Sequence, residues 1–395
     1  MLLEIAKWKE NALSPVLFMV DDIANISVKK FQSDTLKIGE DWGQYAQDKN
    51  SMWDFLYNNL LKKFPEIKTT FFLVTDKRAP MALGESYTYT ERIDKDEKFK
   101  AFLQYLHAHP NVELSYHGTT HGTAAVEHEE FLQEWETFAT LNEAKVEINR
   151  GKELFKSVLG SYPTGGKYCG YEEGKFGASS IAQTGFKWWS YHWDGMMWDK
   201  NSTESKYNYD LEFNQGVVDI PTTVDGSTLS LKIVKKIFTK KYLKSLYLYL
   251  KEGKTIERHI ESLYNNREVI AVQEHSSPYR TDNRIQYPNI ISDMDNLNHI
   301  FSLLAKKDVW YATCGELADY YIARENIKIK VDNDRFQLFS DREIESEITL
   351  MMPFDGVVFS LYDEEDNFIS KFYQKDKKLI ITYCFDINKI YKVKI

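Results

Sequence analysis

The sequence is poor in cysteine and has no excess of positive charge, and both shortages narrow what the protein can be. Its 395 residues include 3 cysteines, which lie far apart and form no C-x-x-C pair. Such a set excludes a disulfide-rich scaffold and a structural zinc site built from cysteine pairs. Lys and Arg number 50 against 59 Asp and Glu, which gives a net charge of -9. We therefore expect no nucleic-acid partner, because neutralising phosphates requires basic faces.

Long apolar runs are also missing. No window approaches the roughly 18 apolar residues that a membrane span needs. The beginning of the chain, MLLEIAKWKENALSPVLFMVDD, is interrupted by charged side chains. It lacks the basic start, apolar centre and small-residue cleavage site of a secretion signal. We therefore expect a soluble, cytoplasmic protein without a membrane span.

What the sequence does contain is a series of short apolar runs separated by segments with helical spacing. The runs are VLFMV (16–20), TTFFLV (69–74), VELSY (112–116), FKWWSY (186–191), GVVDI (216–220), VIAVQ (269–273) and VWYAT (309–313). Continuous apolar strands that alternate with helices predict a parallel sheet covered on both faces. Seven such strands favour an α/β fold in the form of a distorted (β/α) barrel over an open sheet.

The last part of the chain has a different pattern. Residues 326–395 alternate apolar and polar side chains between the turn sequences DND, FDG and DEEDN, a pattern typical of antiparallel strands. We expect two domains, an α/β domain over 1–325 and a small β-sandwich-like appendage over 326–395. The appendage shows no obvious chemistry, and both a packing role and carbohydrate binding are open to it.

Side chains that can do chemistry follow several of the predicted strands. Asp21 and Asp22 come after the first run, and His275 comes after the sixth. The third run ends in SYHGTTHG, which supplies His117 and His121. Reactive groups gather at strand ends in barrels and open α/β sheets, and two imidazoles with one carboxylate form a hydrolytic metal site, commonly of zinc. Helix capping by an aspartate and burial of a satisfied histidine are the plainer alternatives.

The adjacent carboxylates raise a question of geometry. Successive side chains of a strand point to opposite faces, so Asp21 and Asp22 could not both serve one site from a regular strand. Either one of them caps the next element, or both face a cation that offsets their repulsion.

An aromatic stretch offers candidates for sugar binding. Trp193 and Asp194 lie in FKWWSYHWDGMMWD, just past the end of a predicted strand. Indole rings stack on the apolar faces of sugars, and they also fill protein cores. Both functions remain open for Trp193.

The order of VDD, HGTTH, GGKYCGY, WWSYHWD and EH resembles the polysaccharide deacetylases of carbohydrate esterase family 4 over about residues 14–325. The resemblance implies that Asp21 is the catalytic base. It also implies that Asp22, His117 and His121 bind a divalent metal ion, most commonly Zn²⁺. One carboxylate would then hold the metal while its neighbour stays free to accept a proton.

The same resemblance implies a reaction. The backbone N–H of Tyr168 would help to bind the oxyanion, and His275 would protonate the leaving group, a role suited to imidazole near neutral pH. We expect a metal-dependent hydrolase that removes an N-acetyl or O-acetyl group from a saccharide or glycoconjugate. The alternatives are a related metal-dependent hydrolase of another C–N or ester bond, and a non-catalytic saccharide-binding protein on a degenerate scaffold.

Three departures from the family pattern mark a divergent member. Ile23 follows the aspartate pair where the family has glycine, and Gly165 stands where an arginine orients the base. Gln273 replaces a leucine two residues before the last histidine. Lys167 is the candidate to supply the missing positive charge, although an ammonium lacks the planar fork of a guanidinium.

Overall fold

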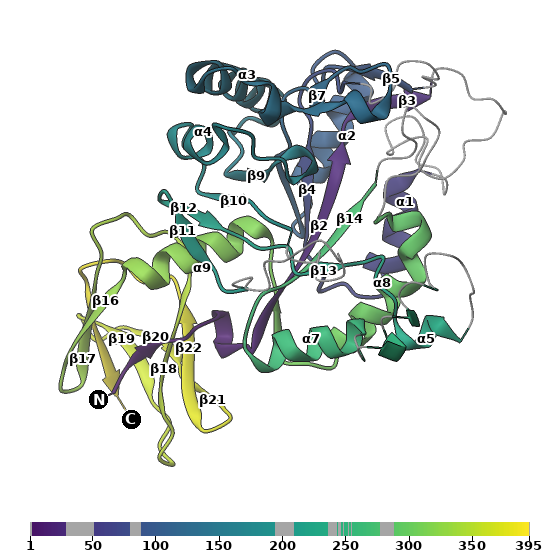
Figure 1. Ribbon diagram of the computed structural model, residues 1–395. Helices are drawn as coiled ribbons and strands as arrows, with labels where there is room; N and C mark the ends of the chain where they lie inside the picture. Colours follow the sequence, from purple (N-terminus) through teal and green to yellow (C-terminus); the bar gives the residue numbers. More distant parts are fainter. Residues whose placement is uncertain are drawn as a thin grey trace. The chain divides into compact units, whose positions relative to one another are not determined.

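The computed structural model describes residues 2–28, 51–79, 88–193, 209–235, 255–276 and 288–394, with single residues and short pieces between 243 and 253. They form two compact units (Figure 1), Val16–Lys307 with Tyr311–Gly315, and Met1–Pro15 with Asp308–Trp310 and Glu316–Ile395. Among the described residues, no helix has the length and apolar content to cross a membrane.

The larger unit is built on parallel strands (Figure 1). These are β2 (Ser14–Ile23), β4 (Thr69–Leu73), β6 (Val112–Tyr116), β9 (Gly165–Lys167), β10 (Trp188–Ser190), β12 (Val217–Asp219), β13 (Val224–Asp225) and β14 (Ile270–His275). They follow the order β12-β10-β9-β6-β4-β2-β14-β13, with β11 (Glu212–Asn214) antiparallel at the outer side of β12.

One bent segment, residues 217–226, closes these strands into a ring. Its first half, β12, pairs with β10, and the N–H of Val218 donates to the carbonyl of Lys187. Its second half, β13, pairs with β14, and the N–H of Thr223 donates to the carbonyl of Ala271. The same stretch of chain therefore joins both ends of the strand order, and the result is the distorted (β/α) barrel that the sequence predicts.

All seven predicted runs form strands, but one of them lies outside the ring, and two ring strands fall outside the predicted runs. The run at 309–313 forms β15 (Val309–Tyr311), which pairs with β2 off the path of the ring. The two unpredicted ring strands are β13, which has only two residues, and β9, which reads GGK. Glycine is required in β9, since a Cβ on Gly165 would lie 2.1 Å from the ring of Trp188.

Helices and two short two-stranded sheets surround the ring (Figure 1). The helices of this unit are α1 (Met52–Leu56), α2 (Glu97–His107), α3 (Leu141–Leu159), α4 (Gly177–Gln183), α5 (Leu231–Val234), α7 (Ile256–Asn265) and α8 (Ile290–Leu304). The small sheets pair β3 (Asn25–Val28) with β5 (Thr88–Glu91) and β7 (Gly122–Thr123) with β8 (Leu132–Gln133). The long helices begin at side-chain caps, Asp96 for α2 and Thr140 for α3. Such caps satisfy N–H groups that have no partner within the helix.

The smaller unit contains two antiparallel sheets with the orders β1-β18-β22-β21 and β16-β17-β23-β19-β20. Its elements are β1 (Glu4–Ile5), α9 (Cys314–Asn326), β16 (Lys328–Asp332), β17 (Arg335–Phe339), β18 (Ile348–Pro353), β19 (Ser360–Asp363), β20 (Phe368–Lys371), β21 (Tyr373–Lys375), β22 (Lys378–Tyr383) and β23 (Ile390–Lys394). Leu338 and Val393 of one sheet share a core with Leu350 and Ile381 of the other. This is the antiparallel β domain that the sequence predicts, with β1 as an additional strand. The predicted division into 1–325 and 326–395 stays a prediction.

Candidate metal centre

A bulge at the end of β2 explains how two adjacent carboxylates share one site. The pairing of β2 with β4 shifts register between Val20 and Ile23, and Asp22 has a positive φ of 68°. A bulge with a left-handed residue breaks the alternation of side chains and redirects them. Asp21 and Asp22 are both buried, and the negative charges of both act on His117. The question of geometry raised by the sequence is thereby answered.

One oxygen of Asp22 faces three cationic or potentially cationic side chains. Its Oδ1 lies 3.0 Å from Nε2 of His121, 3.6 Å from Nε2 of His117 and 3.5 Å from Nη2 of Arg78. The other nitrogen of His117, Nδ1, lies 3.1 Å from the carbonyl oxygen of Lys167. An Nδ1–H donated to that carbonyl leaves Nε2 of His117 with a lone pair directed at Asp22.

Charge and burial keep this group in the form that binds metals. Burial alone would raise the pKa of Asp22, but Arg78 and the two histidines hold it well below its usual range. Burial lowers the pKa of His117 to about 3, against the opposing charge of Asp21. Burial, followed by the charge of Arg78, also lowers the pKa of His121. Near neutral pH the centre thus offers an ionised carboxylate and two neutral imidazoles, as metal binding requires.

The donor atoms also lack partners that would make them unavailable. Neither carboxylate oxygen of Asp22 and neither ring nitrogen of His121 has a well-aligned hydrogen bond to any described residue. Buried polar atoms rarely lack a hydrogen bond in a native protein, and a bound ion is one way to satisfy such atoms. Two histidines and one aspartate with open positions are a donor set typical of catalytic zinc. The residues present therefore fit a divalent cation.

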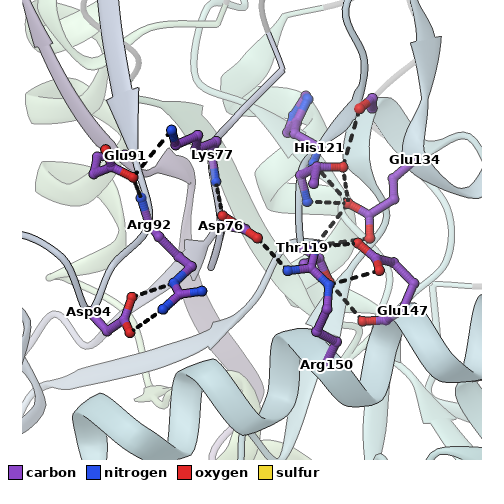
Figure 2. Close-up of polar contacts among 12 residues, drawn as sticks. Asp76, Lys77, Glu91, Arg92, Asp94, Thr119, His121, Glu134, Glu147 and Arg150 are labelled. Atoms are coloured by element: carbon purple, nitrogen blue, oxygen red, sulfur yellow. Dashed lines mark hydrogen bonds and ion pairs between the residues drawn. The ribbon is translucent and has the colours of Figure 1, made fainter.

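The loop between the two histidines is held from inside by Glu134 (Figure 2). Its carboxylate accepts hydrogen bonds from the backbone N–H groups of Thr119, Thr120 and His121 at 2.7 to 2.9 Å. Burial raises the pKa of Glu134 to about 7, although these three donors oppose the shift. On the outer side of the loop, Arg150 bridges Asp76 and Glu147.

Asp21 has different surroundings from its neighbour. The ammonium of Lys167 contacts Oδ1 of Asp21, and Nε2 of His275 lies 3.7 Å from Oδ2. The other ring nitrogen of His275 lies 2.9 Å from the carbonyl oxygen of Pro288, which fixes the orientation of the imidazole. From the sequence we expect Asp21, Lys167 and His275 in one site, and the fold brings these three side chains together.

Lys167 contacts three acceptors, one of which is Gln273. Its ammonium donates to Oε1 of Gln273 at 2.6 Å and to the hydroxyl of Tyr171 at 3.2 Å, and it forms an ion pair with Oδ1 of Asp21. An ammonium has three N–H donors, so Lys167 can serve all three of these groups. Burial lowers the pKa of Lys167, and the charge of Asp21 opposes that shift. Gln273 thus provides a hydrogen-bond acceptor for the buried ammonium. At Gly165, where the sequence lacks the expected arginine, Trp188 leaves no room for a side chain.

The remaining predicted site residues lie near this centre or outside the described residues. The side chain of Tyr168 is buried in an aromatic cluster, with its ring 5.0 Å from that of Trp135, so only its backbone could face a ligand. The ring of Trp193 lies 5.4 Å from that of Tyr171, the hydroxyl partner of Lys167. Asp194 falls outside the residues that the structure describes.

Sequence reasoning missed three residues of this centre. Arg78 and Glu134 carry no motif, and only the fold shows that they contact Asp22 and the histidine loop. Cys169 is the third, since its Sγ lies within 4.8 Å of ligand nitrogens of both histidines. Its thiol donates to the carbonyl of His117 at 3.1 Å, and burial raises its pKa well above the usual value. A protonated thiol is not the form that binds metals.

Comparisons with known proteins add little to this geometry. No family model matches the sequence, and no curated protein matches it either. Solved structures with a similar fold include a probable polysaccharide deacetylase from Pseudomonas aeruginosa PAO1, at 15% identity and a TM-score of 0.42 over 80% of this chain and 93% of that one. The Puue allantoinase has 13% identity and a TM-score of 0.42 over 79% and 91%. A CE4 family pseudoenzyme from Bacillus anthracis has 11% identity and a TM-score of 0.36 over 77% and 65%. At these values the similarities assign neither a family nor an activity.

Proposed function

We propose that this protein is a metal-dependent hydrolase that removes an N-acetyl or O-acetyl group from a saccharide or glycoconjugate. One observation carries the proposal. Asp22 presents to two buried imidazoles a carboxylate without a well-aligned hydrogen bond to the described residues, while Asp21, one residue earlier, forms an ion pair with Lys167 and lies near His275. A metal site with a carboxylate and an imidazole beside it contains the groups that hydrolysis of an acyl bond needs.

Asp22, His117 and His121 would hold the divalent cation, with Zn²⁺ as the first candidate. A bound cation of this kind supplies polarisation of the acyl carbonyl and acidification of water. Asp21 accepts a proton from the attacking water, and the ion pair with Lys167 holds that carboxylate in place. His275 gives a proton to the leaving nitrogen or oxygen. The backbone N–H of Tyr168 is the proposed hydrogen-bond donor to the developing oxyanion.

The sugar would lie toward Trp193. Its indole packs against the ring of Tyr171, whose hydroxyl accepts a hydrogen bond from Lys167. An aromatic face there can stack on the apolar face of a pyranose ring while the acyl group enters between the two aspartates. N-acetylhexosamine oligomers are therefore the first substrates to test.

A saccharide-binding protein without catalysis is the second candidate, and Arg78 favours it. A buried guanidinium beside Asp22 already offsets the charge of that carboxylate, as a metal ion would. A centre balanced by Arg78 alone would bind ligands without activating water.

Acetate release separates the two candidates. The purified protein is stripped with a chelator, reloaded with Zn²⁺, and incubated with N-acetylhexosamine oligomers and a matched O-acetyl sugar. Metal-dependent acetate release that is lost in His117→Ala supports the hydrolase. Oligomer binding by calorimetry without acetate release, in protein shown to contain zinc, contradicts the hydrolase and supports the binding protein.

A further inference from the structure

Glu134 lies directly behind the loop that carries both histidines of the centre. It begins the short helix η4 (Glu134–Thr137) and is only 2% exposed. Its carboxylate accepts the N–H groups of Thr119, Thr120 and His121, three successive residues (Figure 2). A carboxylate bonded by several backbone N–H groups holds a loop more firmly than a neutral acceptor, because charge-assisted hydrogen bonds are stronger.

The conformation of the loop depends on such an acceptor. Gly118 and His121 both have positive φ values, 83° and 71°, which turn the three intervening N–H groups inward. A Cβ on Gly118 would lie 2.6 Å from Oε2 of Glu134, so the glycine provides the room that the carboxylate occupies. Without the carboxylate these buried donors would be unsatisfied, and a left-handed histidine would lose its support.

The two histidines are oriented in different ways. The ring of His117 is fixed through Nδ1 by the carbonyl of Lys167. The ring of His121 has no well-aligned hydrogen bond to a described residue. Metal-binding histidines are commonly oriented by a partner on the second ring nitrogen. Among the described residues, Nδ1 of His121 has no such partner, while Nε2 faces Asp22. The place of the ring therefore depends more on the backbone conformation of His121 than that of His117 does.

We propose that Glu134 is a positioning residue of the metal centre, which acts through the backbone of His121 and sets the place of its imidazole. This inference rests on the proposed function, in which Asp22, His117 and His121 hold a divalent cation. It assigns to Glu134 the orienting function that a ring-bound partner performs for His117.

Binding of Co²⁺ to the full chain tests the proposal, because its visible absorption reports the ligand geometry. We expect Glu134→Gln to bind Co²⁺ about 10- to 100-fold more weakly, the range measured when orienting partners are removed, with an altered spectrum. In the wild type Oε2 accepts all three N–H groups and Oε1 accepts that of Thr119 as well. The amide keeps one acceptor oxygen, but it loses the negative charge and replaces the other oxygen with an NH₂ donor. Glu134→Asp should be intermediate, since it keeps the charge and loses reach. Glu147→Gln is the matched control, because its side chain pairs with Arg150 on the outer side of the loop. It should bind as the wild type does.

Wild-type affinity and an unchanged spectrum in Glu134→Gln would overturn the proposal. If both Glu134 variants lose their far-UV and near-UV circular dichroism, the residue serves the fold as a whole, and the proposal is again wrong. Failure of the proposed function looks different: the wild-type chain would then bind no Co²⁺, or His117→Ala would bind it as tightly as the wild type.

Discussion

The two halves of the centre, around Asp21 and around Asp22, differ in the side chains that face each carboxylate. Asp21 forms an ion pair with Lys167, whose ammonium also donates to Gln273 and Tyr171. Asp22 faces Arg78 and two imidazoles, and neither of its oxygens has a well-aligned hydrogen bond to the described residues. Oδ1 of Asp21 also lacks one, so the difference between the halves is the lysine on one side and the pair of imidazoles on the other. Adjacent residues in the sequence therefore suit different tasks, proton transfer for Asp21 and metal binding for Asp22.

The sharpest test of this comparison exchanges each carboxylate for an amide. Asp21→Asn should keep the metal and lose about 10²- to 10⁴-fold in kcat, because an amide cannot accept the proton of the attacking water. Asp22→Asn should lose the metal on dialysis, since it removes the anionic ligand. Elemental analysis and acetate release are measured on the same samples. Equal metal contents in the two variants would show that the halves are not divided as we propose.

His275, which lies near Asp21, allows the proposed protonation of the leaving group to be tested. An alcohol leaves more easily than an amine, so protonation of the leaving group matters more for amides than for esters. His275→Ala should therefore lower kcat for an N-acetyl substrate by about 10²-fold or more and harm the matched O-acetyl substrate less. Bound metal is confirmed in both proteins. Unchanged amide turnover would remove His275 from the reaction.

Removing one acceptor of Lys167 should lower the activity less than the loss of Asp21 or His275 does. Gln273→Leu leaves an N–H of a buried ammonium without a partner, and we expect kcat to fall about 10- to 100-fold while metal content and KM stay close to wild type. The double variant with Lys167→Met should be no worse than Lys167→Met alone, because the glutamine acts through the lysine. Additive losses in this cycle would contradict that coupling.

Arg78 makes the two halves more alike, because it places a cation beside Asp22 as Lys167 does beside Asp21. It shares Oδ1 of Asp22 with the two imidazoles, so its charge repels a divalent ion bound there. Arg78→Gln should therefore tighten Zn²⁺ binding roughly 10-fold, as measured by competition with a chelating dye. Arg92→Gln, which changes a partly exposed arginine paired with Asp94, is the control. Weaker zinc binding in Arg78→Gln would show that the guanidinium supports the metal.

Much of this centre could be read from the sequence, and the remainder depended on backbone geometry. The apolar runs gave the strands, and residues just after them gave both aspartates and the three histidines. The bulge at Asp22 could not be foreseen, because it is a shift of register between β2 and β4. The partnership of Lys167 with Gln273 spans 106 residues, and only the closed ring of strands brings them together.

The effect of the cations on the pKa of a buried carboxylate can be checked at Asp219, beside which the described residues place no cation. Asp219 lies at the end of β12, where Glu212 and Glu173 act on it and only the N–H of Tyr191 opposes them. Burial raises the pKa of Asp219 to about 7, whereas Arg78 and the histidines hold that of Asp22 low.

An acid whose pKa is raised on folding binds its proton more tightly in the native state. Its contribution to stability is therefore complete below the unfolded pKa of about 4 and is lost as the pH rises toward 7. Asp219→Asn carries no such charge and should remove this part of the pH dependence. We expect the variant to unfold at a similar temperature to the wild type near pH 4 and to be more stable at pH 8, by on the order of 2 kcal/mol. Thermal unfolding followed by circular dichroism across this pH range measures the difference. Parallel curves for the two proteins would mean that Asp219 is already ionised in the folded chain, and burial without a cation would then not be what separates it from Asp22.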